Sequence, residues 1–82
     1  PRAELVGPEL ADLLTLDDAA FRSLFAGSPI KRTGRNRFVR NVAIAAGNSG
    51  DETLAEPLRL LLHDEDEVVA EAAQWALGKL DS

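Results

Sequence analysis

The sequence predicts an all-α protein of about five helices, and three observations lead to this fold class. Apolar residues recur at the i, i+3, i+4 spacing of a helix face, as Leu10, Leu13 and Leu14 do. No segment shows the strict alternation of apolar and polar residues that is typical of a β-strand. Capping and turn residues divide the chain at intervals that suit short helices. A chain of 82 residues accommodates one small domain, which we expect to span residues 1–82.

The first two predicted helices occupy the N-terminal third of the chain. The dipeptide Pro8-Glu9 suits a first helical turn, so a helix is expected to begin there. Thr15, followed three residues later by the carboxylate of Asp18, is expected to cap the second helix. The apolar stripe of that helix consists of Phe21, Leu24 and Phe25. Gly27 then ends the helix, because the Ser-Pro pair after it cannot continue it.

A basic loop is expected over residues 28–37, and it leads into the third helix. This helix is predicted to run from Gly34 or Arg35 to Ala46. Its apolar face consists of Phe38, Val39, Val42, Ala45 and Ala46. The opposite face carries Arg37, Arg40 and Asn41. The stretch GNSGD at residues 47–51 is a dense turn signal that ends the helix.

Leucine and alanine stripes define the last two predicted helices. The fourth helix carries Leu54, Leu58, Leu61 and Leu62. Because Pro57 lies inside this segment, the regular helix either begins near that residue or is kinked by it. Asp64 or Asp66 is expected to cap the fifth helix. The apolar face of the fifth helix consists of Val69, Ala72, Ala73, Ala76 and Leu80.

An internal repeat relates the third and fifth predicted helices. A shift of 31 residues superposes residues 42–47 (VAIAAG) on residues 73–78 (AQWALG). Helices that alternate with turns at a period of about 30 residues are typical of short HEAT-like repeats of the PBS-lyase type, which form an α–α superhelix. We therefore expect residues 28–82 to form a HEAT-like repeat unit and residues 1–27 to act as an N-terminal helical cap.

The distribution of charge along the chain is uneven. The net charge is −5, but residues 19–50 carry six basic side chains and no acidic one, whereas the rest of the chain sums to −11. Local potential steers an anionic ligand more strongly than the overall charge of the molecule does. An acidic protein with this arrangement is therefore a candidate for contact with phosphate groups.

Composition excludes several classes of site. The chain has no cysteine, so it holds no disulfide, thiolate zinc site, iron–sulfur cluster or cysteine nucleophile. The one histidine, His63, lies at a predicted helix end, and the acidic run at residues 64–67 lacks the spacing of a calcium loop. We expect no catalytic residue, metal ligand or cofactor site on this chain. The lack of a long apolar run and of a leader segment predicts a cytoplasmic protein without a membrane segment.

The candidate binding residues are five basic side chains and one amide near the start of the third helix. They are Lys31, Arg32, Arg35, Arg37, Arg40 and Asn41. The basic side chains suit phosphate contact, to which the positive end of the helix adds, and Asn41 suits a hydrogen bond to a base or ribose. The alternative is a solvated helix face whose charges pair with nearby acidic helices. Trp75 is expected in a core or an interface, with base stacking as its alternative role.

Two motifs carry a specific resemblance to a known family. They are GSPIKR at residues 27–32 and GRNRFVRNVAIAAGNSG at residues 34–50. The segments FRSLF at residues 21–25 and WALG at residues 75–78 extend the likeness, so that it covers roughly residues 18–80. On these residues the sequence resembles the C-terminal region of epoxyqueuosine reductase.

This resemblance implies both a fold and a role. The family consists of cobalamin-dependent reductases that convert epoxyqueuosine to queuosine at the wobble position of certain transfer RNAs. Cobalamin and two 4Fe–4S clusters lie in their N-terminal catalytic domains, and the helical, HEAT-like C-terminal region helps to hold the tRNA anticodon stem-loop. The resemblance therefore implies a tRNA-positioning module that contacts the anticodon stem-loop and the N-terminal catalytic domains. We expect the protein to be a monomer. The alternative is a HEAT-like module for protein–protein interaction or scaffolding.

Overall fold

The computed structural model of the chain describes residues 10–81. Its elements are α1 (Leu10–Leu14), α2 (Asp18–Leu24), the 3₁₀ helix η2 (Pro29–Thr33), α3 (Arg35–Ser49), the 3₁₀ helix η3 (Glu52–Leu54), α4 (Ala55–Leu61) and α5 (Glu67–Leu80). Because residues 10–81 contain five α-helices and no β-strand, the predicted all-α class is confirmed. The helix start expected at Pro8 and Glu9 lies outside the described residues. None of the described helices is long and apolar enough to cross a membrane.

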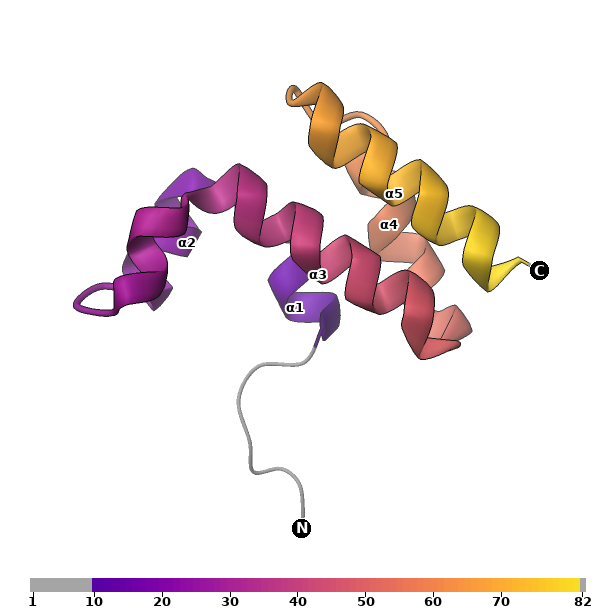
Figure 1. Cartoon of the computed structure of the whole chain (residues 1–82), viewed down its shortest axis with the longest axis horizontal. Helices are drawn as coiled ribbons and strands as arrows, with labels where there is room; N and C mark the ends of the chain where they lie inside the picture. Colours follow the sequence, from indigo (N-terminus) through magenta and orange to yellow (C-terminus); the bar gives the residue numbers. More distant parts are fainter. Residues whose placement is uncertain (1–9, 82) are drawn as a thin grey trace, which may run out of the picture.

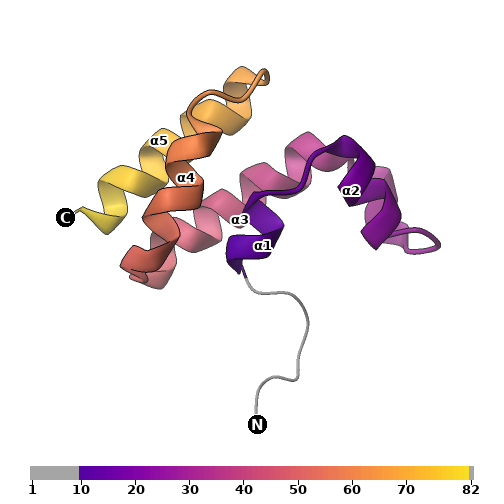
Figure 2. The ribbon, with the colours of Figure 1, turned by 180° about the vertical axis from the view of Figure 1, so that it is seen from behind.

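Helix α3 is the longest element, and the other helices are arranged around it (Figure 1). Helix α5 packs along the C-terminal part of α3, and both helices run toward the same end of the molecule. Helix α4 packs against α5 on the side that Figure 2 brings to the front. Helix α1 contacts α3 and α4, and α2 lies against the N-terminal half of α3. The two helices that the internal repeat relates are therefore direct neighbours.

The apolar core lies between α1, α3, α4 and α5. Its buried residues are Leu14, Val39, Val42, Ala43, Ala46, Leu54, Leu58, Leu61, Val69, Ala72, Ala73 and Ala76. Small residues line the contact between α3 and α5, so the two backbones approach closely. At Gly47 a Cβ atom would lie 2.8 Å from the Cα of Ala76 and 3.0 Å from Cζ3 of Trp75. Only glycine fits this position without displacing the backbone of α5.

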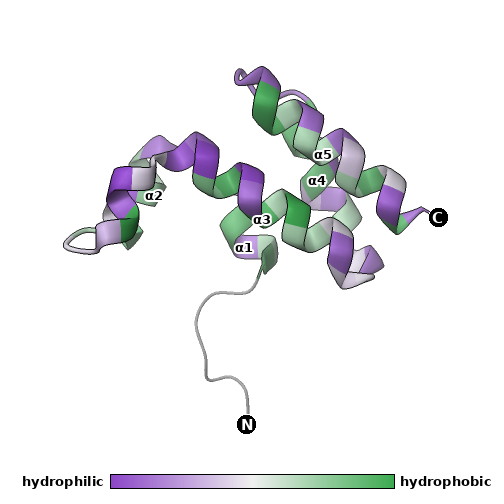
Figure 3. Ribbon diagram, in the orientation of Figure 1, coloured by the Kyte–Doolittle hydropathy of each residue, from purple (hydrophilic) through white to green (hydrophobic). Residues whose placement is uncertain are grey.

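A second apolar cluster joins α2 to the start of α3. The rings of Phe21 and Phe25 lie 5.1 Å apart between centroids, and Phe38 of α3 lies 5.4 Å and 4.9 Å from them. Such tilted and edge-on pairs are the favoured geometry of aromatic side chains. This cluster fixes the N-terminal half of α3, where the ribbon of Figure 3 is coloured mainly for hydrophilic residues.

The buried face of α3 differs from the expected one at Ala45. This residue is exposed, whereas Ala43 is fully buried and Gly47 is also buried. The buried stripe follows the helical spacing from Val39 through Val42 to Ala46, and Ala45 lies outside that stripe. The expectation for Ala45 was therefore wrong, because the contact with α5 lies on the side of α3 that carries Ala43 and Gly47.

Two helix boundaries and one predicted loop also differ from the prediction. Asp17 caps α2 by accepting the Ala20 N–H at 2.7 Å, whereas the Thr15 hydroxyl donates back to the carbonyl of Asp12 in α1. Helix α3 continues to Ser49 and ends at Gly50, which has a φ of 73°. The expected basic loop contains the 3₁₀ helix η2, which the Ser28 hydroxyl caps. The expectation that Thr15 caps α2 was wrong, because the Thr15 hydroxyl donates to a carbonyl oxygen of the preceding helix instead.

For each of the last two helices the sequence left two possible starts, and the structure agrees with one of them. Helix α4 starts at Ala55, so Pro57 stands in its first turn, where a missing N–H costs nothing. Asp66 caps α5 by accepting the N–H of Val68 at 3.0 Å. Asp64 instead accepts the N–H of Asp66 at 3.0 Å and so holds the turn before the helix.

Asp51 gives the fold a dependence on pH. Hydrogen bonds from the Thr53 hydroxyl (2.6 Å) and then the Thr53 N–H (3.0 Å) lower the pKa of Asp51 below its ordinary value of 3.8. A lowered folded-state pKa contributes stability that is present above the unfolded-state pKa and is lost as pH falls through the folded-state pKa. We expect Asp51→Ala to be less stable than the parent chain at neutral pH, with the gap narrowing below 3.8. Urea unfolding across this range measures the gap, and a gap that is constant with pH contradicts the assignment.

Candidate nucleic-acid interface

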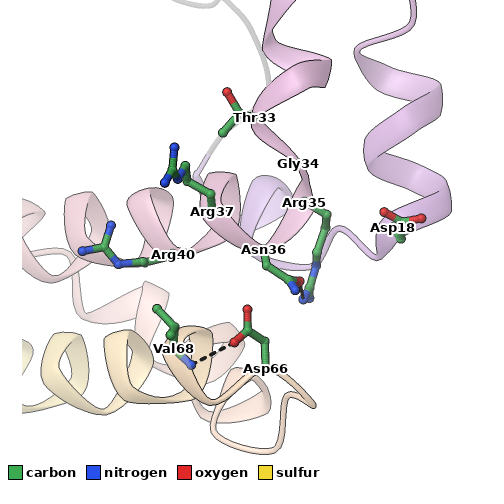
Figure 4. Close-up of a pocket in the computed structure, with 9 residues that line it drawn as sticks. All are labelled: Asp18, Thr33, Gly34, Arg35, Asn36, Arg37, Arg40, Asp66 and Val68. Atoms are coloured by element: carbon green, nitrogen blue, oxygen red, sulfur yellow. Dashed lines mark hydrogen bonds between the residues drawn. The ribbon is translucent and has the colours of Figure 1, made fainter.

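Arg37 and Arg40 project from the exposed face of α3, one turn apart, and line a groove that runs between α3 and the start of α5. Figure 4 shows both side chains rising from the same stretch of helix. Within residues 10–81 neither guanidinium is in an ion pair, and Arg40 Nη1 donates to Asn41 Oδ1 at 3.1 Å. Two unneutralised guanidinium groups therefore stand together beside a cavity.

The polar section of this groove has a volume of about 670 Å³. Its lining residues are Asp18, Thr33, Gly34, Arg35, Asn36, Arg37, Arg40, Asp66 and Val68. The two acidic groups in this set have internal partners, because Asp18 pairs with Arg22 at 3.0 Å and Asp66 caps α5. The lining residues therefore have a net positive charge, which is supplied by the arginine side chains of α3.

The N-terminus of α3 opens into the same groove. Its N-cap is Gly34, which has a φ of 88° and offers no side-chain acceptor, and the first turn contains no acidic residue. The cap and first turn therefore offer no side chain that compensates the positive end of the helix dipole, and the carboxylate of Asp64 pairs with Arg35 of that turn. A residue with a Cβ atom would be strained at this φ, so the left-handed backbone that opens this helix end depends on glycine.

Arg35 lies in an internal network, although its sequence position suggested a phosphate contact. Its Nε donates to the carbonyl oxygen of Leu16 at 2.8 Å, and its Nη1 lies 2.8 Å and 3.1 Å from the two carboxylate oxygens of Asp64. The side chains of Arg35 and Asp64 are 14% and 13% exposed. One guanidinium therefore ties the segment before α2 and the turn before α5 to the start of α3.

The other predicted site residues are all exposed, but they lie apart from the cavity. Lys31 and Arg32 belong to η2, and neither lines the groove. Asn41 lies on α3 beside Arg40, on the face that the helical spacing indicates. The structure thus brings Arg37, Arg40 and Asn41 together, places Lys31 and Arg32 on the preceding turn, and uses Arg35 internally.

An apolar section continues the groove along α3, and sequence reasoning did not identify it. It has a volume of about 410 Å³ and is lined by Arg40, Ile44, Val68, Glu71, Ala72 and Trp75. Arg40 and Val68 belong to both sections, so the two are continuous. The contributing side chains come from two helices far apart in the sequence. Only the internal repeat, which makes α3 and α5 neighbours, gave a signal that they would meet.

The described residues contain no group of three or more histidine, cysteine, aspartate or glutamate side chains that is arranged to hold a metal ion. The fold and the groove together define a helical domain with a basic, partly apolar groove.

Three relatives are all named epoxyqueuosine reductase. The chain is 40% identical to the protein of Shewanella oneidensis over 81 residues, 37% to that of Xanthomonas campestris over 79 residues, and 32% to that of Lactococcus garvieae over 83 residues. These matches cover 95%, 95% and 100% of this chain but 21%, 22% and 24% of the relatives. The chain is homologous to one segment of the epoxyqueuosine reductases and spans less than a quarter of the length of these relatives. No family model matches it, and neither does any solved structure.

Proposed function

We propose that this chain is the tRNA-positioning C-terminal module of an epoxyqueuosine-reductase-like enzyme and that it binds the anticodon stem-loop of a transfer RNA. The observation that carries the proposal is the pair Arg37 and Arg40, which are exposed, have no ion pair within the described residues and lie beside an uncapped helix N-terminus. Guanidinium groups bind phosphate through two parallel hydrogen bonds, and helix N-termini attract anions. The homology to proteins named epoxyqueuosine reductase, a family that the resemblance links to transfer RNA, supports an RNA phosphate as this anion.

The proposal assigns phosphate contact to four basic residues: Lys31, Arg32, Arg37 and Arg40. Arg35 is assigned a positioning role, because its guanidinium is held by Asp64 and Leu16. Asn41, next to Arg40, is assigned a hydrogen bond to a base or ribose. The HEAT-like arrangement serves this role by presenting the two related helices, α3 and α5, along one groove.

The chemistry of the reaction belongs to other domains in this proposal. The 4Fe–4S clusters that the resemblance implies are held by cysteine thiolates, and this chain has no cysteine, so the clusters do not fit here. Cobalamin and both clusters are assigned to catalytic domains that precede this segment in the parent protein. The module then holds tRNA in the cytoplasm while those domains act on the wobble nucleotide.

Salt dependence of binding tests the proposal. We expect the chain to bind a synthetic anticodon stem-loop with a log–log salt slope of about −2.8 to −3.6, because each of four phosphate contacts contributes about −0.7 to −0.9. The double variant Arg37→Ala/Arg40→Ala should lose roughly 10-fold or more in affinity, and its slope should become shallower by about 2. Fluorescence anisotropy with a labelled stem-loop measures both quantities.

Arg59→Ala is the control for this experiment, because Arg59 is an exposed base of α4 outside the groove. It should leave the affinity nearly unchanged. Equal affinities for the parent chain and the double variant, with circular dichroism showing that both are folded, would overturn the proposal.

A protein-interaction module is the second candidate function, and exposed leucines on α4 favour it. Leu60 is 66% exposed and Leu62, which follows α4 directly, is 39% exposed. A groove of about 420 Å³ is lined in part by Leu62, Leu77 and Leu80. Apolar association of this kind is insensitive to salt. Sedimentation that shows self-association unaffected by salt, together with no binding of the stem-loop, would favour this function over the first.

A further inference from the structure

Trp75 presents a large aromatic surface to solvent. It is 45% exposed on α5, although tryptophan side chains are mostly buried in small domains. One edge of its ring is anchored on α3, since Cζ3 lies 3.0 Å from where a Cβ atom of Gly47 would stand. Lys79, one turn further along α5, places Nζ 5.9 Å from the ring centroid. The ring is thus held in place by its surroundings while nearly half of the residue is open.

The open part of Trp75 belongs to the apolar section of the groove. Ile44, Val68 and Ala72 line that section together with the ring, and its volume of about 410 Å³ lies in the range of small-molecule sites. The section is continuous with the polar section through Arg40. A ligand with one anionic and one flat apolar part would therefore span both sections.

The charges along the groove determine the orientation in which such a ligand would bind. Arg40 stands where the sections meet, and Arg37 lies one turn before it in the polar section. Glu71 lies in the apolar section, where its carboxylate repels a phosphate and accepts a hydrogen bond from an amino group. A nucleotide meets both demands when its phosphate lies at Arg40 and its base lies between Trp75 and the apolar wall.

We infer that the apolar section binds an unpaired base of the same RNA, stacked on Trp75, with the adjoining phosphate on Arg40 and an amino group of the base facing Glu71. This inference rests on the proposed function and adds a base-specific element to a phosphate-binding surface. Stacking on an aromatic side chain is a general way in which proteins hold single-stranded loops.

Trp75 is the only tryptophan of the chain, so its fluorescence reports on this contact directly. We expect the intact stem-loop to quench the emission with a midpoint equal to the dissociation constant from anisotropy. A stem-loop of the same length whose loop nucleotides are abasic should bind through its phosphates but leave the emission nearly unchanged. Both titrations use the 82-residue parent chain, so neither depends on a variant that folds.

Variants provide the second readout. Trp75→Ala should weaken binding of the intact stem-loop by at least about 5-fold and should not change binding of the abasic one. Trp75→Phe should recover most of the loss, because phenylalanine also offers an aromatic face. Leu60→Ala, which removes an even more exposed apolar side chain from α4, is the control and should bind both RNAs as the parent does.

The outcomes separate the two proposals. Salt-dependent binding with equal emission changes for the intact and abasic stem-loops would overturn the stacking inference and leave the proposed function standing. An emission change that requires the catalytic domains of a relative, and not RNA, would assign the apolar section to a protein segment and also overturn the inference. The absence of any binding to either RNA would overturn the proposed function itself, and the inference with it.

Discussion

Replacing Gly47 by alanine is expected to lower the free energy of unfolding by about 1–3 kcal/mol, the usual cost of overpacking a core. The new Cβ atom would lie 2.8 Å from the Cα of Ala76 and 3.0 Å from its Cβ, so α3 and α5 must separate along their contact. Alanine is favoured over glycine within a helix by up to about 1 kcal/mol, which offsets part of this cost. Because the obstacle is the backbone of a neighbouring helix rather than a flexible side chain, the clash is the larger effect.

Gly78→Ala is the matched control for this prediction. Gly78 is the residue that the internal repeat aligns with Gly47, it also lies inside a helix, and a Cβ atom there meets nothing within 4 Å. The gain in helix propensity then acts alone, so this variant should be as stable as the parent chain or slightly more stable. Thermal and urea unfolding of both variants measures the difference. If Gly47→Ala is no less stable than Gly78→Ala, the described contact between α3 and α5 is incorrect.

Arg35→Ala is expected to lower the free energy of unfolding by about 2 kcal/mol, less than for a fully buried pair because this one retains some exposure. The substitution leaves the Asp64 carboxylate, which is 13% exposed, without its cation and the Leu16 carbonyl without its donor. Arg35→Lys should recover only part of the loss. A single ammonium cannot reproduce the separate contacts of Nε and Nη1.

The control for Arg35→Ala is Arg22→Ala. Arg22 pairs with Asp18 across one helical turn, with side chains 69% and 64% exposed, so its loss should cost less than about 0.5 kcal/mol. RNA binding distinguishes the two roles of Arg35. As a positioning residue, its replacement should leave the salt slope of stem-loop binding unchanged while lowering the unfolding midpoint. A slope shallower by about 1, with stability intact, would instead make Arg35 a phosphate contact.

The sequence was sufficient to predict where the helices lie, but not where each of them begins and ends. Apolar spacing placed the helices around Phe21, Val42, Leu58 and Ala73, because burial of a stripe depends mainly on helical period. Cap positions depend on single hydrogen bonds between nearby groups. Thr15 and Asp17 are both able to cap, and the choice of Asp17 follows from where α1 ends. Such choices are settled by tertiary structure.

The candidate site was predictable to a similar extent. Exposure of Arg37 and Arg40 follows from their position opposite the apolar face of one helix. The internal role of Arg35 does not, because its partners are 19 and 29 residues away along the chain. The apolar section around Trp75 also requires two helices to meet, which the internal repeat suggests but composition does not. Contacts between segments that are distant in the sequence cannot be predicted from local sequence patterns.

The space at Gly78 gives this small domain a use in protein engineering. At Gly47 the missing side chain leaves room for α5, whereas at the aligned Gly78 an added Cβ atom would meet nothing within 4 Å. Because the chain has no cysteine, Gly78→Cys would carry a thiol-linked probe at a single defined position on α5. Such a probe would report on α5 without entering its contact with α3.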